Sequence, residues 1–188
     1  MLGSTAVLDA CVLYPASLRD FLLRLASAGL YSPRWSAVIH AEWTSNLLAD
    51  RPDITPAQLA RTQSLMDIAV PTALVTGHEP LIEGLTNHPK DRHVLAVAIQ
   101  GQASLIITFN LKDFPATTLS PHGVRAIHPD AFTLSLYQSN PTDMVKIIQR
   151  HRAQLTRPPK NAQEYLDTLG QCHLRQTASV LQKHLDEL

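Results

Sequence analysis

The stretch TAVLDACVL at residues 5–13 sets the character of the fold, because an apolar run in it ends at a carboxylate. Residues 5–10 have the aliphatic composition of a buried strand, and Asp9 closes that run. A lone carboxylate is unfavourable inside a core, so Asp9 is expected at a polar edge of the structure. Strand and helix patterns alternate after this segment. We therefore expect an α/β fold with a mostly parallel sheet covered by helices.

Local signals place the other elements of this fold. Helices are predicted at about 17–28, from Ser36 through Leu48, at 55–70 and at 91–100, and further strands at 72–76, 104–108 and 124–127. Ser17 with Asp20 resembles a capping box, and Gly29 supplies a stop for the first long helix. Ser36 is expected to cap the second helix, and Thr55 precedes the third.

The last third of the chain has a different pattern. From about Ala131 onward only helical periodicity is found, and it is interrupted at Asn140-Pro141 and Arg157-Pro158-Pro159. We divide the chain into an α/β domain at 1–134 and a helical appendage at 135–188. The alternative is that these helices complete the core of one domain, and the sequence leaves that choice open.

Composition limits the class of protein. The chain has 188 residues, of which 45% are hydrophobic and 17% charged, and its formal net charge is zero. This composition is typical of a folded soluble domain. The longest apolar runs are far shorter than the roughly 20 residues that cross a bilayer, and the start lacks the basic region of an export signal. The two cysteines make no convincing disulfide framework or zinc site, so a cytoplasmic protein without membrane association is expected.

Basic residues gather in one part of the helical segment. Five cations follow one another without an intervening acid: Lys146, Arg150, Arg152, Arg157 and Lys160. Such a stretch could contact phosphate groups of a nucleic acid. A solvated helix face or a subunit contact explains it equally well.

Four acids occupy positions where elements begin or end, or where a helix is apolar: Asp9, Glu42, Asp91 and Asp113. Strand carboxyl ends and neighbouring helix starts converge at one edge of a parallel sheet, so these carboxylates are expected to share a pocket. Crowded carboxylates favour a cation, and hard oxygen ligands suit Mg²⁺ or Mn²⁺. Each acid also has a structural interpretation, as a turn ligand, a bend cap, an exposed helix residue or a partner of the helix dipole.

Local motifs add a resemblance to a known family. The motifs are VLDACVL at 7–13, the helix-borne Glu42, DRHVLAVA at 91–98 and TFNLKDF at 108–114. In order and spacing they resemble PIN-domain proteins, in particular VapC-like toxin ribonucleases of bacterial toxin-antitoxin pairs. The resemblance covers about residues 5–130 and implies an α/β/α sandwich.

The resemblance also implies an activity and partners. It implies a Mg²⁺- or Mn²⁺-dependent endoribonuclease with an RNA substrate, a cognate antitoxin protein and a homodimer. By the same resemblance, Asp9, Glu42, Asp91 and Asp113 are the catalytic and metal-binding acids, and Thr108 and Asn110 are supporting polar residues. Physically, a metal ion could lower the pKa of a water nucleophile and hold the oxygens of a phosphodiester in line.

The RNA contacts are expected at cations near the acids and on the appendage: Arg19, Arg92, Lys112, Lys146, Arg150, Arg152 and Arg157. Two other functions remain open. A phosphatase could use Asp9 as its nucleophile, although Cys11 and not a second acid stands two residues later. A noncatalytic PIN-like module could bind RNA or protein without turnover. We interpret His93 and His128 as structural histidines.

Overall fold

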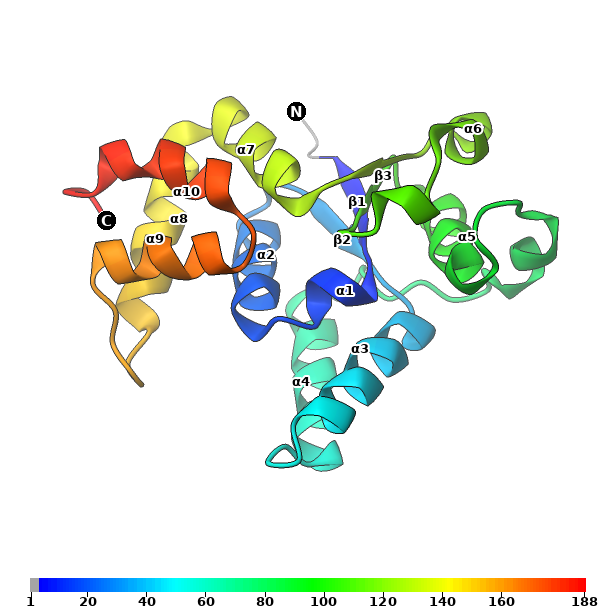
Figure 1. Ribbon diagram of the computed structural model, residues 1–188, viewed down its shortest axis with the longest axis horizontal. Helices are drawn as coiled ribbons and strands as arrows, with labels where there is room; N and C mark the ends of the chain where they lie inside the picture. The colour runs from blue at the N-terminus through cyan, green and yellow to red at the C-terminus, as the bar shows by residue number, and fades with distance from the viewer. Residues whose placement is uncertain (1–3) are drawn as a thin grey trace.

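A single all-parallel sheet of four strands forms the centre of the protein (Figure 1). The computed structural model describes residues 4–188. The strands are β1 (Thr5–Leu8), β2 (Ser32–Arg34), β3 (Leu105–Ile107) and β4 (Arg125–Ile127), arranged in the order β2-β1-β3-β4. Ala6 is paired with both Pro33 and Leu105, so β1 lies in the middle of the sheet. The predicted α/β class with a parallel sheet is confirmed.

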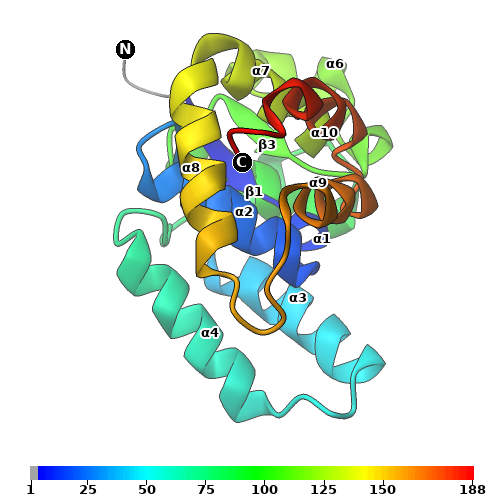
Figure 2. The same cartoon turned by 90° about the vertical axis from the view of Figure 1, so that its left-hand side faces the viewer.

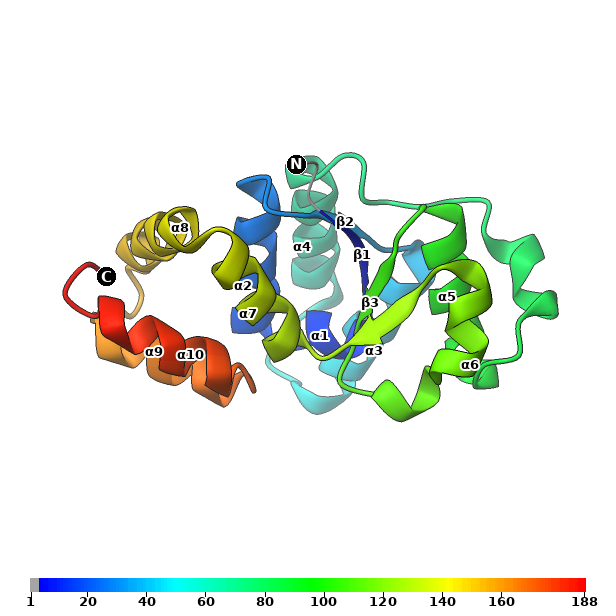
Figure 3. The ribbon, with the colours of Figure 1, turned by 90° about the horizontal axis from the view of Figure 1, so that it is seen from above.

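Helices connect these strands and cover the sheet. They are α1 (Ala10–Leu13), α2 (Ala16–Ser27), α3 (Ala37–Asp50), α4 (Pro56–Ala69), η1 (Glu79–Gly84), η2 (Pro89–Asp91), α5 (Arg92–Gln100), η3 (Leu111–Asp113), α6 (Ala116–Leu119) and η4 (Ser120–His122). Seen from above, α2 lies on one side of the sheet and α5 on the other (Figure 3). The helices α3 and α4 extend from the body as a pair (Figure 1). This layering is the predicted α/β/α sandwich.

One predicted strand is wrong and another was missed. Residues 72–76 contain no strand, and Leu74 forms only an isolated parallel bridge with Trp35. The strand β2 has three residues and contains Pro33, which has no backbone N–H to donate to a ladder. Proline is tolerated in a strand at the edge of a sheet, where one side needs no ladder partner. The β2 sequence Ser-Pro-Arg also lacks the aliphatic residues that mark the equally short β3 and β4.

Helix ends follow local chemistry in most cases. Ser36 Oγ accepts from the N–H of Ile39, and Thr55 forms a capping box with Gln58, so both predicted starts are confirmed. Gly29 follows α2 with a φ of +79°, the left-handed conformation that favours glycine. The predicted capping box of Ser17 and Asp20 is wrong. Pro15 holds the N-cap position of α2 and makes no side-chain cap bond.

The C-terminal segment is helical, as predicted. It consists of α7 (Pro129–Ser139), α8 (Pro141–Gln154), α9 (Ala162–Gln171), α10 (Arg175–Leu181) and η5 (Gln182–His184). The helix α8 runs beside α2 (Figure 2), and α9 also contacts α2. Tyr31 and Phe132 pack edge to face with ring centroids 5.0 Å apart. These contacts make the buried side chains of the C-terminal helices continuous with those around the sheet.

Within residues 4–188, none of the helices has both the length and the apolar character that crossing a bilayer requires.

Candidate active site

Asp9 lies at the carboxyl end of β1 and is the most completely held of the four predicted acids. Its side chain is 4% exposed. One carboxylate oxygen accepts from the N–H of Ala10 at 2.7 Å, and the other accepts from the Thr108 hydroxyl at 2.6 Å. Thr108 follows β3, so neighbouring parallel strands bring the two residues together at one edge of the sheet. These hydrogen bonds fix the orientation of a buried carboxylate.

Cys11 is a member of this cluster that the sequence did not identify. Its thiol donates to Asp9 at 3.2 Å and lies 3.4 Å from the Thr108 hydroxyl, and its sulfur accepts from the N–H of Phe109 at 3.3 Å. Burial, with a smaller contribution from the negative charge of Asp9, raises the pKa of Cys11 to about 12. The side chain is therefore a neutral thiol at physiological pH. It connects Asp9 to the segment that follows β3.

Asp91 stands at the N-cap of α5, at the same edge of the sheet. Burial raises the pKa of Asp91 above its usual value, and the charges of Asp9 and Asp113 add to that rise. His88 lies 3.0 Å from the Asp91 carboxylate and opposes the effect. The mutual influence of the three acids places Asp9, Asp91 and Asp113 in one electrostatic environment. His88, three residues before Asp91, is recognisable from sequence as an i,i+3 partner.

Glu42 extends from α3 toward α5 and pairs with His93. The His93 Nε2 atom lies 3.2 Å from a Glu42 oxygen. Burial lowers the pKa of His93, but the hydrogen bond to Glu42 and the charges of Glu42 and Asp9 outweigh burial, so the net shift is upward. His93 thus connects Glu42 on α3 to α5, the helix that begins after Asp91. Its interpretation as a structural histidine stays a prediction.

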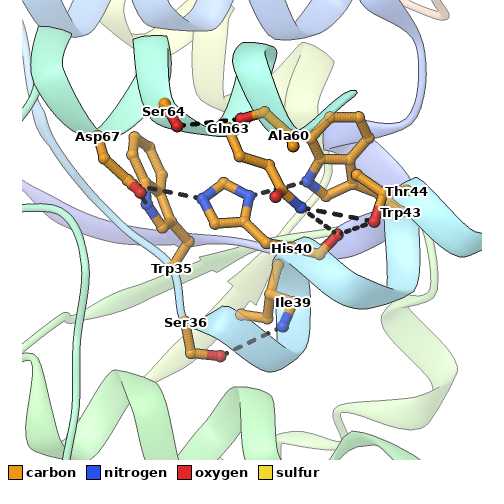
Figure 4. Close-up of polar contacts among 10 residues, drawn as sticks. All are labelled: Trp35, Ser36, Ile39, His40, Trp43, Thr44, Ala60, Gln63, Ser64 and Asp67. Carbon is orange, nitrogen blue, oxygen red and sulfur yellow. Dashed lines mark hydrogen bonds and ion pairs between the residues drawn. The ribbon is translucent and has the colours of Figure 1, made fainter. Parts of the chain in front are cut away.

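A buried polar network holds the helix that carries Glu42. His40 lies between Trp43 and Asp67 (Figure 4). The Trp43 indole N–H donates to His40 Nδ1 at 3.0 Å, and His40 Nε2 lies 3.4 Å from Asp67 on α4. Trp35 also donates to Asp67, at 2.8 Å. An indole can only donate, so His40 Nδ1 carries no proton and Nε2 carries one. The network locks α3 to α4.

The residues predicted to support the acids or to contact RNA near them differ in exposure and in hydrogen bonding. The Asn110 N–H donates to the Thr108 hydroxyl at 2.9 Å, so its backbone belongs to the cluster, and its side chain is exposed. Arg92 donates through Nε to the carbonyl oxygen of Asn87, and Lys112 is exposed. Arg19 is buried, donates to the carbonyl oxygen of Leu13 and lies over the Trp43 ring at 4.5 Å. The expectation that Arg19 contacts phosphate is therefore wrong.

The cations of the C-terminal segment divide into two kinds. Lys146 and Arg150 are exposed on α8. Arg152 donates to the carbonyl oxygens of Leu188 and Lys160, which makes it an internal brace. Arg157 is exposed and helps to line a cavity of about 750 Å³ between α2, α4 and α9. None of the four predicted acids lines this cavity. The cavity and the acids are therefore different places.

The donor set was tested against a divalent cation. Within residues 4–188, no three His, Cys, Asp or Glu side chains are gathered closely enough to hold one metal ion together. Mg²⁺ commonly keeps several waters and uses only one or two protein carboxylates, so a complete protein cage is not required. The oxygen donors, and the raised pKa of Asp91 among neighbouring acids, fit a hard cation.

Comparisons with known proteins agree with the sequence resemblance. The family model described as VapC50 C-terminal domain matches residues 129–183. A protein of Mycobacterium tuberculosis (strain ATCC 25618 / H37Rv), named "Putative ribonuclease VapC50", is 38% identical over 100 residues. The aligned part is 53% of this chain and 59% of that relative, less than two thirds of its length. No solved structure gives a significant match. Both matches support the resemblance to VapC-like toxin ribonucleases.

Proposed function

We propose that this protein is a divalent-metal-dependent endoribonuclease and the toxin of a toxin-antitoxin pair. The observation that carries the proposal is the placement of Asp9 after β1, Asp91 at the N-cap of α5 and Asp113 at the end of η3 beyond β3, where burial and the charges of Asp9 and Asp113 raise the pKa of Asp91. A ribonuclease name on a relative that is 38% identical supports the same activity.

The proposed roles follow from the surroundings of each acid. One or two of Asp9, Asp91 and Asp113 would bind a Mg²⁺ or Mn²⁺ ion directly, with waters completing its coordination. Glu42 would hold a second ion or orient water. When bound, the cation would make a water more acidic and offset the charge that builds on the phosphate oxygens. Thr108 keeps one Asp9 oxygen oriented through its 2.6 Å hydrogen bond. His93 orients Glu42 from α5.

RNA cleavage by the purified chain tests the proposal. Cleavage is expected with Mg²⁺ or Mn²⁺ and not in excess chelator. The change Asp9→Asn should lower the rate by roughly 100-fold or more, since it weakens binding of the cation that would offset the charge developing on the phosphate. Asp186→Asn is the matched control, because Asp186 is exposed. Equal cleavage by folded Asp9→Asn, or by wild type in chelator, would overturn the metal-site assignment.

Two measurements separate the competing functions. A phosphatase would hydrolyse small phosphomonoesters and form an aspartyl-phosphate at Asp9. A binding module would retain RNA or protein affinity without metal-dependent turnover. Cleavage of RNA phosphodiester bonds together with inactivity toward phosphomonoesters is the result that we expect.

The proposed antitoxin is a small protein whose segment covers the acidic edge. Coexpression with the product of a neighbouring small reading frame should then relieve growth inhibition by this chain. The purified complex should also be inactive on RNA. Persistent toxicity in cells that demonstrably contain the complex would contradict inhibition at the active site. The proposed homodimer would appear as a doubled mass in solution.

A further inference from the structure

Three aromatic side chains meet beside the acidic site, and they come from three separate segments. Phe109 follows Thr108 after β3, His128 follows β4, and His173 lies in the turn between α9 and α10. The Phe109 ring centroid lies 5.2 Å from that of His128 and 5.4 Å from that of His173. We call these three residues the ring cluster.

The ring cluster is connected directly to the acids. The N–H of Phe109 donates to the Cys11 sulfur, and the Cys11 thiol donates to Asp9. Phe109 also follows Thr108, whose hydroxyl donates to the same carboxylate. A ligand whose phosphate lies at the acids would therefore have its neighbouring atoms near these rings.

The rings remain accessible. Phe109 and His128 are half-buried, and His173 is exposed. Their interplanar angles are 67° and 73°, so the pairs meet edge to face. In an edge-to-face pair, one ring points its edge at a face of the other. The ring that contributes its edge has both of its own faces free of that partner. The cluster thus presents aromatic surface to solvent at the edge of the site.

The backbone at His173 is unusual for a histidine. Its φ is +63°, in the left-handed region. The N–H of His173 donates to the Gly170 carbonyl and the N–H of Leu174 to that of Leu169, which is the Schellman ending of a helix. Glycine is the favoured residue at this position, because a side chain strains it. Such strain at a residue beside a candidate site suggests a role for its side chain.

The charge of the rings suits a neutral ligand group. The His128 Nδ1 atom accepts from the N–H of Asp130 at 3.1 Å, which fixes the orientation of its ring. Burial lowers the pKa of His128, and the nearby His173 lowers it further against the opposing effect of Asp130. The Phe109 ring and a neutral His128 ring offer π-faces and not a charged phosphate contact. Nucleobases are neutral, flat and covalently joined to phosphates, so they match this surface.

We propose that Phe109, His128 and His173 form a stacking subsite for a nucleobase of single-stranded RNA, with His173 supplied by the C-terminal helices. The proposal rests on the proposed ribonuclease function, since the acids would position the adjacent phosphate. Single-stranded RNA is the occupant because its bases expose faces that a duplex keeps stacked. The C-terminal helices would thereby complete the substrate site and not merely cover α2.

Binding measurements on two probes test the subsite. The first probe is a mixed-sequence single-stranded RNA, and the second has the same length and backbone with abasic sugars. All binding is measured in the Asp9→Asn chain, which should not cleave. Phe109→Leu and His173→Gly should each weaken binding of the first probe about fivefold or more and leave the second unchanged, because only the first probe can stack.

His173→Gly keeps the test independent of misfolding, since glycine relieves the strained φ and the melting temperature should stay equal or rise. His122→Ala is the matched control, because it removes an exposed histidine that precedes β4, at the opposite end of that strand from His128. Equal loss on both probes, or no loss on either, would overturn the subsite. Loss confined to antitoxin binding would identify a protein contact and also overturn it. Base-dependent binding in a chain that never cleaves RNA would refute the nuclease function alone.

Discussion

At the scale of single residues, the hydrogen bond between Asp9 and Thr108 distinguishes a positioned carboxylate from an ordinary turn aspartate. Asp9 is buried at 4% exposure, so each of its oxygens needs a donor. The Ala10 N–H supplies one and Thr108 supplies another. The second donor comes from a different strand, which makes the orientation of Asp9 depend on the tertiary fold.

Replacing Thr108 by valine should expose that dependence. The change keeps the shape of the side chain and removes the donor, so a buried charged oxygen loses a partner. The free energy of unfolding should fall by about 1–3 kcal/mol, measured by urea denaturation. RNA cleavage should fall as well if Asp9 acts as proposed. Thr117→Val, at an exposed position, serves as the control; an unchanged stability in Thr108→Val would contradict the inferred bond.

The sequence predicted the acids and Thr108, but it did not predict Cys11 as a partner of Asp9. Asp9 and Asp91 are recognisable because each marks the end of a buried strand or the start of an apolar helix. Cys11 resembles an ordinary apolar residue, and its contact with Phe109 spans 98 positions, a distance over which no local pattern extends. The expected phosphate contact of Arg19 rested on its charge alone. In the fold its guanidinium packs on the Trp43 ring instead.

At the scale of elements, predictability followed the length of the pattern. The helices α3, α4 and α5 have enough turns to show their caps and apolar residues, and their starts were predicted. The strand β2 is as short as β3 and β4, but its sequence Ser-Pro-Arg lacks the aliphatic residues that marked those two strands, and its register against β1 is set by the tertiary fold. Residues 72–76 have the composition of a strand, yet only Leu74 pairs with a neighbour. Composition alone cannot distinguish a strand from an extended connection.

The contact between α2 and α8 should be sensitive to acid. His151 Nε2 lies 2.8 Å from an Asp20 oxygen, and its Nδ1 lies 2.8 Å from the Tyr165 hydroxyl. The hydrogen bond to His151 lowers the pKa of Asp20 below its usual 3.8, and the charges of His151 and Arg24 contribute further. A depressed carboxyl pKa stabilises the fold above pH 3.8, and the stabilisation is lost as the pH falls through the lower folded value.

The variant Asp20→Asn tests this linkage. Wild type should be more stable than the variant at pH 6, and the difference should shrink at pH 3, in urea unfolding at both values. Because Asp20 is partly exposed, solvent weakens the effect. Asp143→Asn, on an exposed residue of α8, controls for general charge effects. A stability difference that is the same at both pH values would refute the role of the Asp20 carboxylate.

A second element-scale prediction concerns α10. The buried Asp130 on α7 accepts from the backbone N–H groups of Gln176 and Thr177 and from the Thr177 hydroxyl. Asp130→Ala would leave these donors without their acceptor, so the free energy of unfolding should fall by about 2–3 kcal/mol. Asp130→Asn should lose less, because its amide oxygen still accepts. Hydrogen exchange in α10 should increase most; equal protection in the alanine variant would contradict this capping role.

At the scale of the whole molecule, the C-terminal helices are joined to the sheet layer by polar and aromatic contacts at several points. Arg24 donates a hydrogen bond to Gln154, Asp20 is hydrogen-bonded to His151, and the Tyr31 ring packs on that of Phe132. The sequence showed that this segment is helical but not where it packs, because its apolar residues fit many partners. The sequence also does not distinguish the cations of this segment that are exposed from those that bind backbone carbonyls. Only the structure shows that Arg152 is committed to backbone carbonyls.

That separation sharpens the expected effect of charge on RNA binding. Neutralising Lys146 and Arg150 together, by Lys146→Gln and Arg150→Gln, should weaken RNA binding without unfolding the chain, since both side chains are exposed. If each contacts one phosphate, the slope of log affinity against log salt should become shallower by about 1.4, because each phosphate contact on a single strand contributes about 0.7. Fluorescence anisotropy between low and moderate salt gives that slope. Arg61→Gln with Arg125→Gln removes two exposed cations elsewhere and should leave the slope unchanged. An unchanged slope in the α8 variant would make these cations a solvated helix face, whereas a loss confined to antitoxin binding would make them a protein interface.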